Sequence, residues 1–117
     1  MNTFICYPKC STCKKALKFL KENNINYELR DIKLNNPNKE ELDKLIKLSG
    51  KDIKTFFNTS GLLYRSLELK DKIPNMSYEE KLELLASDGM LVKRPIFVTN
   101  DDALVGFKEK EWNKLIK

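Results

Sequence analysis

The sequence predicts an α/β fold in which one mixed four-stranded sheet is flanked by helices on both sides. Three observations lead to this prediction. A short apolar run at residues 3–7 is followed directly by an amphipathic helix pattern and then by a second strand pattern. Two short apolar segments, 96–99 and 103–107, enclose a polar turn and are typical of a β-hairpin. The chain between these two parts, about residues 36–90, shows only helical patterns.

The first part of the chain predicts a β-α-β unit. Residues 3–7 have apolar side chains on both faces, which is typical of a central strand. Pro8 ends this strand, Ser11 is the expected N-cap, and the helix is expected to reach about Glu22. A strand over about 25–32 follows, and a right-handed crossover makes the two strands parallel.

The middle of the chain predicts a helical insertion. Asn38 with Glu41, and Ser77 with Glu80, have the spacing of capping boxes at the starts of two helices. We expect the first of these helices to end at Ser49-Gly50 and the second to stop at Gly89. The two segments between them, 52–57 and 62–70, are expected to form a short helical turn and a helix.

The end of the chain predicts the hairpin and a last helix from about Lys108, which buries Trp112, Leu115 and Ile116. The resulting order is β-α-β, several helices, β-β and α. It is the connectivity of a thioredoxin-like fold with a helical insertion between its two halves. At 117 residues, the chain is expected to form a single domain over 1–117.

The composition of the chain excludes or disfavours several classes of function. The net charge of +5 comes from 22 basic and 17 acidic residues that alternate along helices. This pattern favours solvated helix faces, and we expect no direct nucleic-acid binding. No apolar run approaches the ~20 residues of a membrane span, and no signal peptide is visible, so we expect a cytoplasmic protein that does not bind membranes. The absence of histidine excludes Cys–His nucleophiles and mixed Cys/His zinc sites.

Cys10 and Cys13 form a C-x-x-C motif where the first strand gives way to the first helix. Unpaired N–H groups and the helix dipole stabilise a thiolate at such a helix start, so Cys10 is the expected nucleophile. Cys13 lies one turn inside the helix and is expected to resolve the mixed disulfide, making a redox-active centre that cycles through a disulfide bond. The alternatives are half of a zinc site or two unreactive thiols.

Cys6 extends the motif to C-x-x-x-C-x-x-C, which matches the iron–sulfur motif of radical SAM enzymes. However, Cys6 lies within the predicted strand, Pro8 stiffens the link to Cys10, and the chain is too short for the barrel of those enzymes. We therefore predict that Cys6 is a small buried apolar residue and that the protein has no metal site.

A second motif, Lys93-Arg94-Pro95-Ile96, opens the predicted hairpin. Base rates favour a trans peptide bond before Pro95, but this position would face the dithiol in a thioredoxin-like fold, where a cis bond exposes backbone to substrate. Arg94 is either a stabiliser of the Cys10 thiolate or of an oxyanion, or an ordinary surface arginine. The sequence leaves both questions open. Lys9 and Lys14 raise the positive potential around the cysteines and also fit a solvated helix face.

These blocks together resemble the glutaredoxin-linked arsenate reductase/Spx family. The resemblance rests on residues 7–16, 56–61, 84–96 and 105–107, and covers essentially the whole chain. It implies a thioredoxin-like fold with a helical insertion, a nucleophilic Cys10 and an anion-stabilising Arg94. It also implies a thiol donor (glutathione, glutaredoxin or thioredoxin) and no bound cofactor. The substrate-binding residues expected around this centre are Lys9, Ser11, Thr12, Lys14 and Pro95.

Two departures from the family pattern change the expected chemistry. Arsenate reductases of the family commonly have a serine where this chain has Cys13, and they use three arginines around the oxyanion. Only Arg94 matches, because Asn58 and Gly106 occupy the other two places. We therefore predict a small thiol–disulfide oxidoreductase that acts on arsenate or another oxyanion poorly. The alternative is an Spx-type redox-sensing transcriptional regulator that binds the RNA polymerase α subunit.

Overall fold

A computed structural model describes residues 2–116 and confirms the predicted mixed four-stranded sheet. The strand order is β2-β1-β3-β4. β1 pairs in parallel with β2 and antiparallel with β3, and β3 pairs antiparallel with β4. The strands are β1 (Thr3–Cys6), β2 (Glu28–Asp31), β3 (Ile96–Val98) and β4 (Ala103–Val105). β1 and β3, which carry the two sequence motifs at their ends, therefore lie next to each other.

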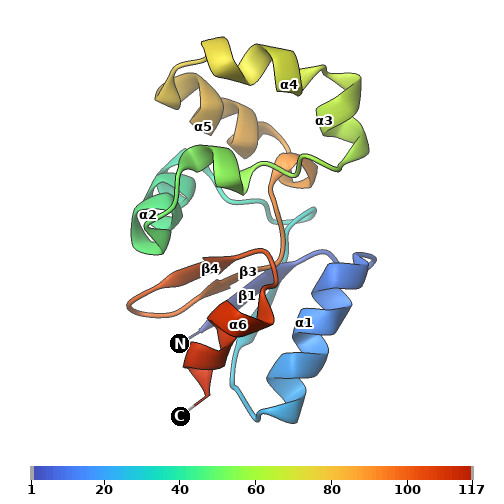
Figure 1. The fold of residues 1–117 in the computed structure, drawn as a ribbon, viewed down its shortest axis with the longest axis vertical. Coiled ribbons are helices and arrows are strands. Elements are labelled where there is room, and N and C mark those ends of the chain that lie inside the picture. Colours follow the sequence, from blue (N-terminus) through green and yellow to red (C-terminus); the bar gives the residue numbers. More distant parts are fainter. Residues whose placement is uncertain (1, 117) are drawn as a thin grey trace.

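The two faces of the sheet pack against different helices (Figure 1). One face meets α1 (Ser11–Glu22) and α6 (Glu109–Trp112), and Phe4, Cys6 and Trp112 are buried there. The other face meets the insertion, and Ile5 is buried on that side. Because side chains alternate across a strand, Cys6 points to the same side as Phe4, toward α1.

The insertion lies above the sheet in Figure 1 and forms most of the larger apolar core. Both predicted capping boxes are present, at Asn38 with Glu41 and at Ser77 with Glu80. Its α-helices are α2 (Lys39–Ser49), α3 (Leu62–Ser66), α4 (Leu69–Lys72) and α5 (Tyr78–Ser87), and 3₁₀ turns occur at Ile53–Phe56, Ile73–Asn75 and Gly89–Leu91.

Three predicted elements differ in the structure. The helix expected over 62–70 is divided into α3 and α4, because Glu68 adopts a left-handed backbone with φ of 55°. The second strand is shorter than 25–32 and lies at the sheet edge, which leaves Leu29 60% exposed. The last helix is a single α-turn followed by a 3₁₀ turn at Asn113–Leu115, so Ile116 is exposed rather than buried.

Gly89 does not end the preceding helix, as the sequence predicted, but has another role. α5 ends at Ser87, and Gly89 begins the next 3₁₀ turn. A Cβ atom at this position would lie 2.0 Å from the carbonyl oxygen of Ile32. Gly89 is therefore required for the close approach of two backbone segments.

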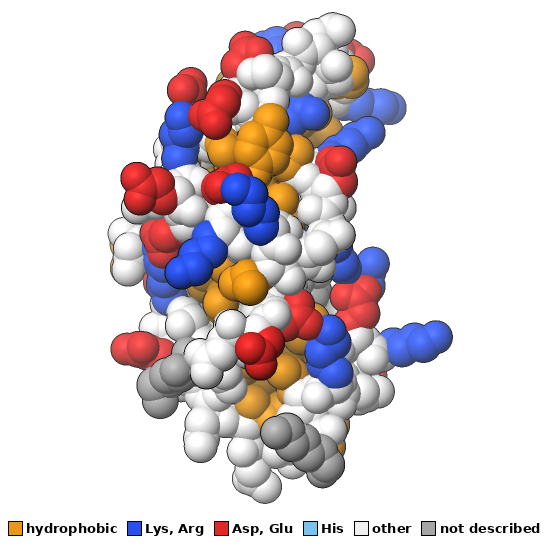
Figure 2. Space-filling view, turned by 90° about the vertical axis from the view of Figure 1, so that its left-hand side faces the viewer, with side chains coloured by type: hydrophobic (Ala, Val, Ile, Leu, Met, Phe, Trp, Pro, Cys, Tyr) orange, Lys and Arg blue, Asp and Glu red, His pale blue; other side chains and the backbone are white. Residues whose placement is uncertain are grey.

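The outer surface carries charges of both signs, as the alternating pattern predicted. Figure 2 shows lysine, arginine and carboxylate side chains interspersed over one face, with small apolar patches between them. The best-defined ion pair, Arg30 with Glu41, joins β2 to α2 through two hydrogen bonds of 2.6 and 3.0 Å. None of the helices within residues 2–116 has the length and apolar character needed to cross a membrane.

Candidate active site

Cys10 occupies the N-cap of α1, the position that the sequence assigned to Ser11. Its backbone is extended, its N–H donates to the Tyr7 carbonyl at 2.9 Å, and its own carbonyl accepts the first helical hydrogen bond from Lys14 at 3.1 Å. Ser11 is the first helical residue rather than the N-cap, because this tight turn lets the helix begin one residue earlier than predicted. The Cys10 thiol, which is partly exposed, therefore lies directly at the positive end of the helix.

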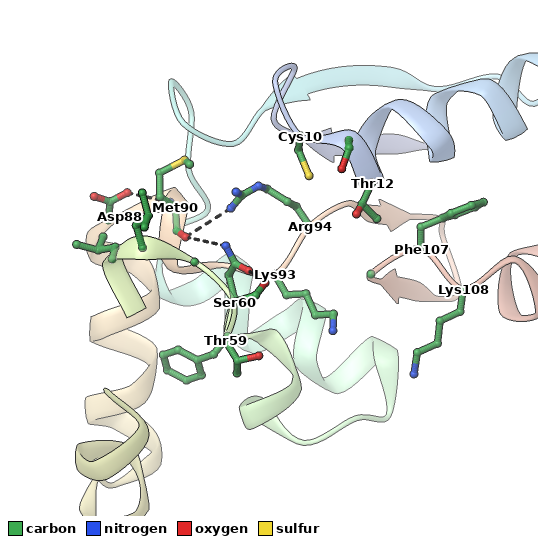
Figure 3. A pocket seen from close by; sticks show the side chains of 17 residues that line it. Cys10, Thr12, Thr59, Ser60, Asp88, Met90, Lys93, Arg94, Phe107 and Lys108 are labelled. Atoms are coloured by element: carbon green, nitrogen blue, oxygen red, sulfur yellow. Dashed lines mark hydrogen bonds between the residues drawn. The ribbon is translucent and has the colours of Figure 1, made fainter. Parts of the chain in front are cut away.

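A cavity of about 770 Å³ opens beside this turn. Figure 3 shows Cys10 and Thr12 on one wall and Arg94 on the neighbouring one. Segments far apart in the sequence meet here because β1 and β3 are adjacent and the insertion folds back over their ends. The wall consists of residues 10–12, 57–63 and 106–108, together with Asp88, Met90, Lys93 and Arg94.

Arg94 has an unusual hydrogen-bond arrangement. It precedes β3, and the Arg94–Pro95 peptide bond is cis. Its guanidinium lies 5.4 Å from the centre of the Tyr7 ring, and its Nη1 atom donates two long hydrogen bonds of 3.4 Å to the carbonyls of Met90 and Val92. Its Nε atom is buried and has no partner among the described residues. A buried cationic donor without a partner is costly, which marks Arg94 as a candidate partner for a thiolate or a bound anion.

Cys13 lies beneath the cavity wall and is fully enclosed. Its side chain is 2% exposed, and the Tyr7 backbone N–H donates to its sulfur at 3.3 Å. The pKa of Cys13 is raised, first because its thiol donates a hydrogen bond to Cys6 and second because it is buried. Cys13 therefore stays protonated at neutral pH, which leaves Cys10 as the thiol that faces the cavity.

Cys6 is buried, as predicted, and is 5% exposed. The prediction missed its place beside Cys13, with which it shares the buried core on this side of the sheet. Hydrogen bonding with Cys13 lowers the pKa of Cys6. The alternation of side chains along β1 could have predicted this proximity, because it places Cys6 on the side of the sheet that meets the buried face of α1.

The other predicted site residues are divided between the cavity and its surroundings. Ser11 and Thr12 line the cavity. Lys9 and Lys14 are exposed and lie outside its wall, and Pro95 is buried next to Arg94 without lining the cavity.

Several lining residues were not predicted as site residues, notably Lys93, Lys108 and the loop 57–63 apart from Asn58. No spacing rule connects these segments, because only the folding of the whole chain brings them to Cys10. Within residues 2–116, no three Cys, His, Asp or Glu side chains are grouped in a way that could hold a metal ion.

Comparison with known proteins places this site in a family. The model of the ArsC family matches residues 6–115. The chain is 51% identical to the uncharacterized protein YusI of Bacillus subtilis over 96% of this chain and 95% of the relative. It is 33% identical to the regulatory protein MgsR of the same organism over 98% and 90%. A crystal structure of an ArsC family related protein from Bacteroides fragilis superposes with a TM-score of 0.96 at 54% identity, over 97% and 96%.

Proposed function

Because this chain belongs to the ArsC family, as its motifs predicted, we propose that it is a small thiol–disulfide oxidoreductase. One observation carries the proposal. The Cys10 thiol and the guanidinium of Arg94, with its unpaired Nε atom, share one cavity, while the Cys13 thiol lies one helical turn beneath Cys10. This arrangement supplies a nucleophile, a cation to stabilise its thiolate, and a second thiol for resolution.

The reaction has two exchange steps. The Cys10 thiolate attacks one sulfur of a substrate disulfide, forms a mixed disulfide and releases one substrate thiolate. Cys13 then loses its proton to solvent and attacks the Cys10 sulfur, which releases the second substrate thiolate and leaves a Cys10–Cys13 disulfide. The substrate gains two electrons and the protein loses two. A thiol donor such as glutathione, glutaredoxin or thioredoxin would reduce the protein again, in the cytoplasm and without a bound cofactor.

Oxyanion reduction is expected to be poor. Asn58 and Gly106, which stand where family arsenate reductases have arginines, line the same cavity as Arg94. Neither residue offers a positive charge, so arsenate would meet one guanidinium in this position rather than three.

Exchange kinetics of the reduced protein with a neutral aromatic disulfide test the proposal. Cys10→Ser should remove the fast reaction, whereas Cys13→Ser should keep it and accumulate a mixed disulfide that mass spectrometry detects. Arg94→Gln should slow the reaction about tenfold at neutral pH, since a nearby cation favours the thiolate. Arg65→Gln, a change at an exposed arginine outside the cavity, is the matched control. Equal rates for the two arginine variants would refute the role of Arg94, and a fast reaction in Cys10→Ser would refute the whole proposal.

A second candidate function is favoured by the 33% identity with the regulatory protein MgsR over 90% of that relative. In this case the same dithiol would sense oxidants, and the protein would bind the RNA polymerase α subunit in one redox state. Pull-down of purified α subunit with the reduced and the oxidised protein distinguishes the two functions. Binding that changes with the redox state of Cys10 and Cys13 would support regulation, and no binding in either state would exclude it.

A further inference from the structure

The cavity beside Cys10 carries two lysines that the thiol–disulfide exchange itself does not use. Lys93 and Lys108 line it together with Arg94, and Asp88 is the one carboxylate among the described lining residues. The wall therefore has a net charge of +2. The carboxylate of Asp88 is already engaged, since it accepts a hydrogen bond from the Met90 backbone N–H at 2.8 Å.

Gly106 creates the space in which Lys93 reaches the cavity. A Cβ atom at position 106 would lie 2.8 Å from Cε of Lys93, so any other residue would push this side chain away. Gly106 is held firmly, because its N–H donates to the Pro95 carbonyl at 2.8 Å and its carbonyl accepts from Nε1 of the buried Trp112 at 3.0 Å. Lys93 thus lies over a rigid piece of backbone with left-handed φ of 71°.

Lys108 lies two residues beyond Gly106, at the N-cap of α6. Figure 3 shows the side chains of Lys93 and Lys108 extending from their walls toward one another, away from the cysteine in this view. Both ammonium groups therefore add positive charge to the cavity beyond that of the Arg94 guanidinium.

The charges of this lysine pair are only weakly compensated. Lys93 has no ion pair with any residue from 2 to 116. Lys108 lies 3.8 Å from a Glu111 carboxylate whose other oxygen is bound to Lys51 at 2.9 Å, and the Lys108 side chain is 61% exposed. Two like charges in one cavity raise its positive potential, which a bound anion would lower.

The size of the cavity indicates a ligand larger than an inorganic oxyanion. Its volume of about 770 Å³ lies within the roughly 300–1,000 Å³ typical of sites for small organic molecules. We infer that Lys93 and Lys108 form a carboxylate-binding subsite, and that the substrate is a small organic disulfide that carries carboxylates. This inference rests on the proposed function. In the first exchange step the lysine pair would hold the carboxylate of the substrate while the Cys10 thiolate attacks one sulfur and the other sulfur leaves as a thiolate.

Two chromogenic disulfides, one anionic and one neutral, test this inference. 5,5′-Dithiobis(2-nitrobenzoate) carries two carboxylates, and 4,4′-dithiodipyridine is neutral at pH 7.5. The second-order rate constant of each disulfide with the reduced protein is measured at about 20 mM and at about 500 mM salt. At the higher concentration, the attraction between charges is largely screened. Lys93→Gln and Lys108→Gln should each slow the anionic disulfide about threefold at low salt, because each removes one water-screened unit charge that attracts the carboxylate. The rate of the neutral disulfide should fall much less than that of the anionic disulfide in both variants, because only the anionic one has a carboxylate for the lysines to attract.

Lys110→Gln is the matched control, because it removes the same charge from α6 at an exposed position outside the cavity. It should leave both rates within the error of the wild-type values. Equal effects of the cavity lysines on both disulfides, or no effect on either, would overturn the carboxylate subsite while leaving the proposed function intact. A wild-type protein that reacts with the neutral disulfide no faster than a free small thiol would overturn the proposed function, and the carboxylate subsite with it.

Discussion

The backbone N–H of Tyr7 donates a hydrogen bond to the sulfur of Cys13, across the turn that carries Cys10 at its end. The same turn returns the Cys10 N–H to the Tyr7 carbonyl at 2.9 Å. One residue directly after β1 therefore contacts both cysteines of the C-x-x-C motif. Cys6 and Cys13 are both buried on this side of the motif, where Cys6 raises the pKa of Cys13, whereas Cys10 is partly exposed.

The Cys6 contact predicts a pH effect on the second exchange step. The raised pKa of Cys13 keeps its thiolate scarce at neutral pH, so resolution of a mixed disulfide should accelerate as the pH rises. Cys6→Ala removes the group that contributes most to this shift, and should make resolution several-fold faster at pH 7, because each unit by which the pKa of Cys13 falls raises its thiolate fraction about tenfold. Rapid-quench mass spectrometry of the mixed disulfide between pH 6 and 9 measures the rate.

Cys6→Val, which also removes the sulfur but fills its space, controls for the cavity that alanine leaves. Both variants should shift the pH profile in the same direction. An unchanged profile in both would show that burial alone keeps Cys13 protonated.

Gly89 provides a test of the packing between the insertion and the end of β2. Gly89→Ala should lower the free energy of unfolding by about 3 kcal/mol, because the added Cβ would meet the Ile32 backbone and neither chain segment can move easily. Gly50→Ala is the matched control, since Gly50 has φ of 69° with no atom within 4 Å of an added Cβ. It should cost only about 1 kcal/mol from backbone strain. Urea denaturation measures both, and equal losses would contradict the packing argument.

The fold could be predicted largely because its signals are local. The capping box at Asn38, the C-x-x-C position after a short strand, and the hairpin around Asn100 each specify their own element. Failures occurred where tertiary packing overrides local preference. Glu68 interrupts a helical pattern with a left-handed backbone, and Gly89 serves a contact with Ile32 that is 57 residues away in sequence.

The candidate site was predictable only in part, for a related physical reason. Cys10, Cys13 and Arg94 carry chemistry that their residue types and positions reveal. The residue types and sequence positions of Lys93 and Lys108 do not indicate a site, because a lysine near a strand or helix end is normally a solvated side chain. Only the folding of the whole chain brings these two lysines to the cavity, where the missing side chain of Gly106 leaves room for Lys93.

Asn58 offers a gain-of-function test of the oxyanion argument. Asn58→Arg restores a cation at one of the two places where family arsenate reductases have arginine, and Asn58 lines the cavity with Arg94. The variant should bind arsenate about tenfold more tightly, as expected for an added charge-assisted hydrogen bond. Competition by arsenate against the reaction of Cys10 with a neutral disulfide measures this affinity.

Asn58→Gln, which changes length without adding charge, is the control and should not improve arsenate binding. The corresponding change at Gly106 is not expected to succeed, because φ of 71° and the contact with Lys93 both oppose a side chain there. Unchanged arsenate affinity in Asn58→Arg would contradict the prediction that the missing arginine limits oxyanion binding.

The Arg30–Glu41 pair predicts how stability depends on pH. The pKa of Glu41 is lowered, chiefly by its hydrogen bonds from Arg30. A carboxyl group whose pKa is lower in the folded state stabilises the protein above its unfolded pKa of about 4.3. This contribution is lost as the pH falls through the folded value. Glu41→Gln keeps an oxygen for the capping hydrogen bond from Asn38 but loses the charge that pairs with Arg30. It should therefore lower the free energy of unfolding at pH 7 and have progressively less effect below pH ~4.

The expected loss at pH 7 is about 1 kcal/mol or less, because the Glu41 side chain is 41% exposed and water screens the pair. Urea denaturation at several pH values between 7 and 3.5 measures the difference from the wild-type protein. Glu22→Gln, at an exposed pair whose atoms are 3.8 Å apart, should show almost no difference at any of these pH values. A penalty for Glu41→Gln that stays constant down to pH 3.5 would show that the geometry of the amide, rather than the lost charge, causes the destabilisation.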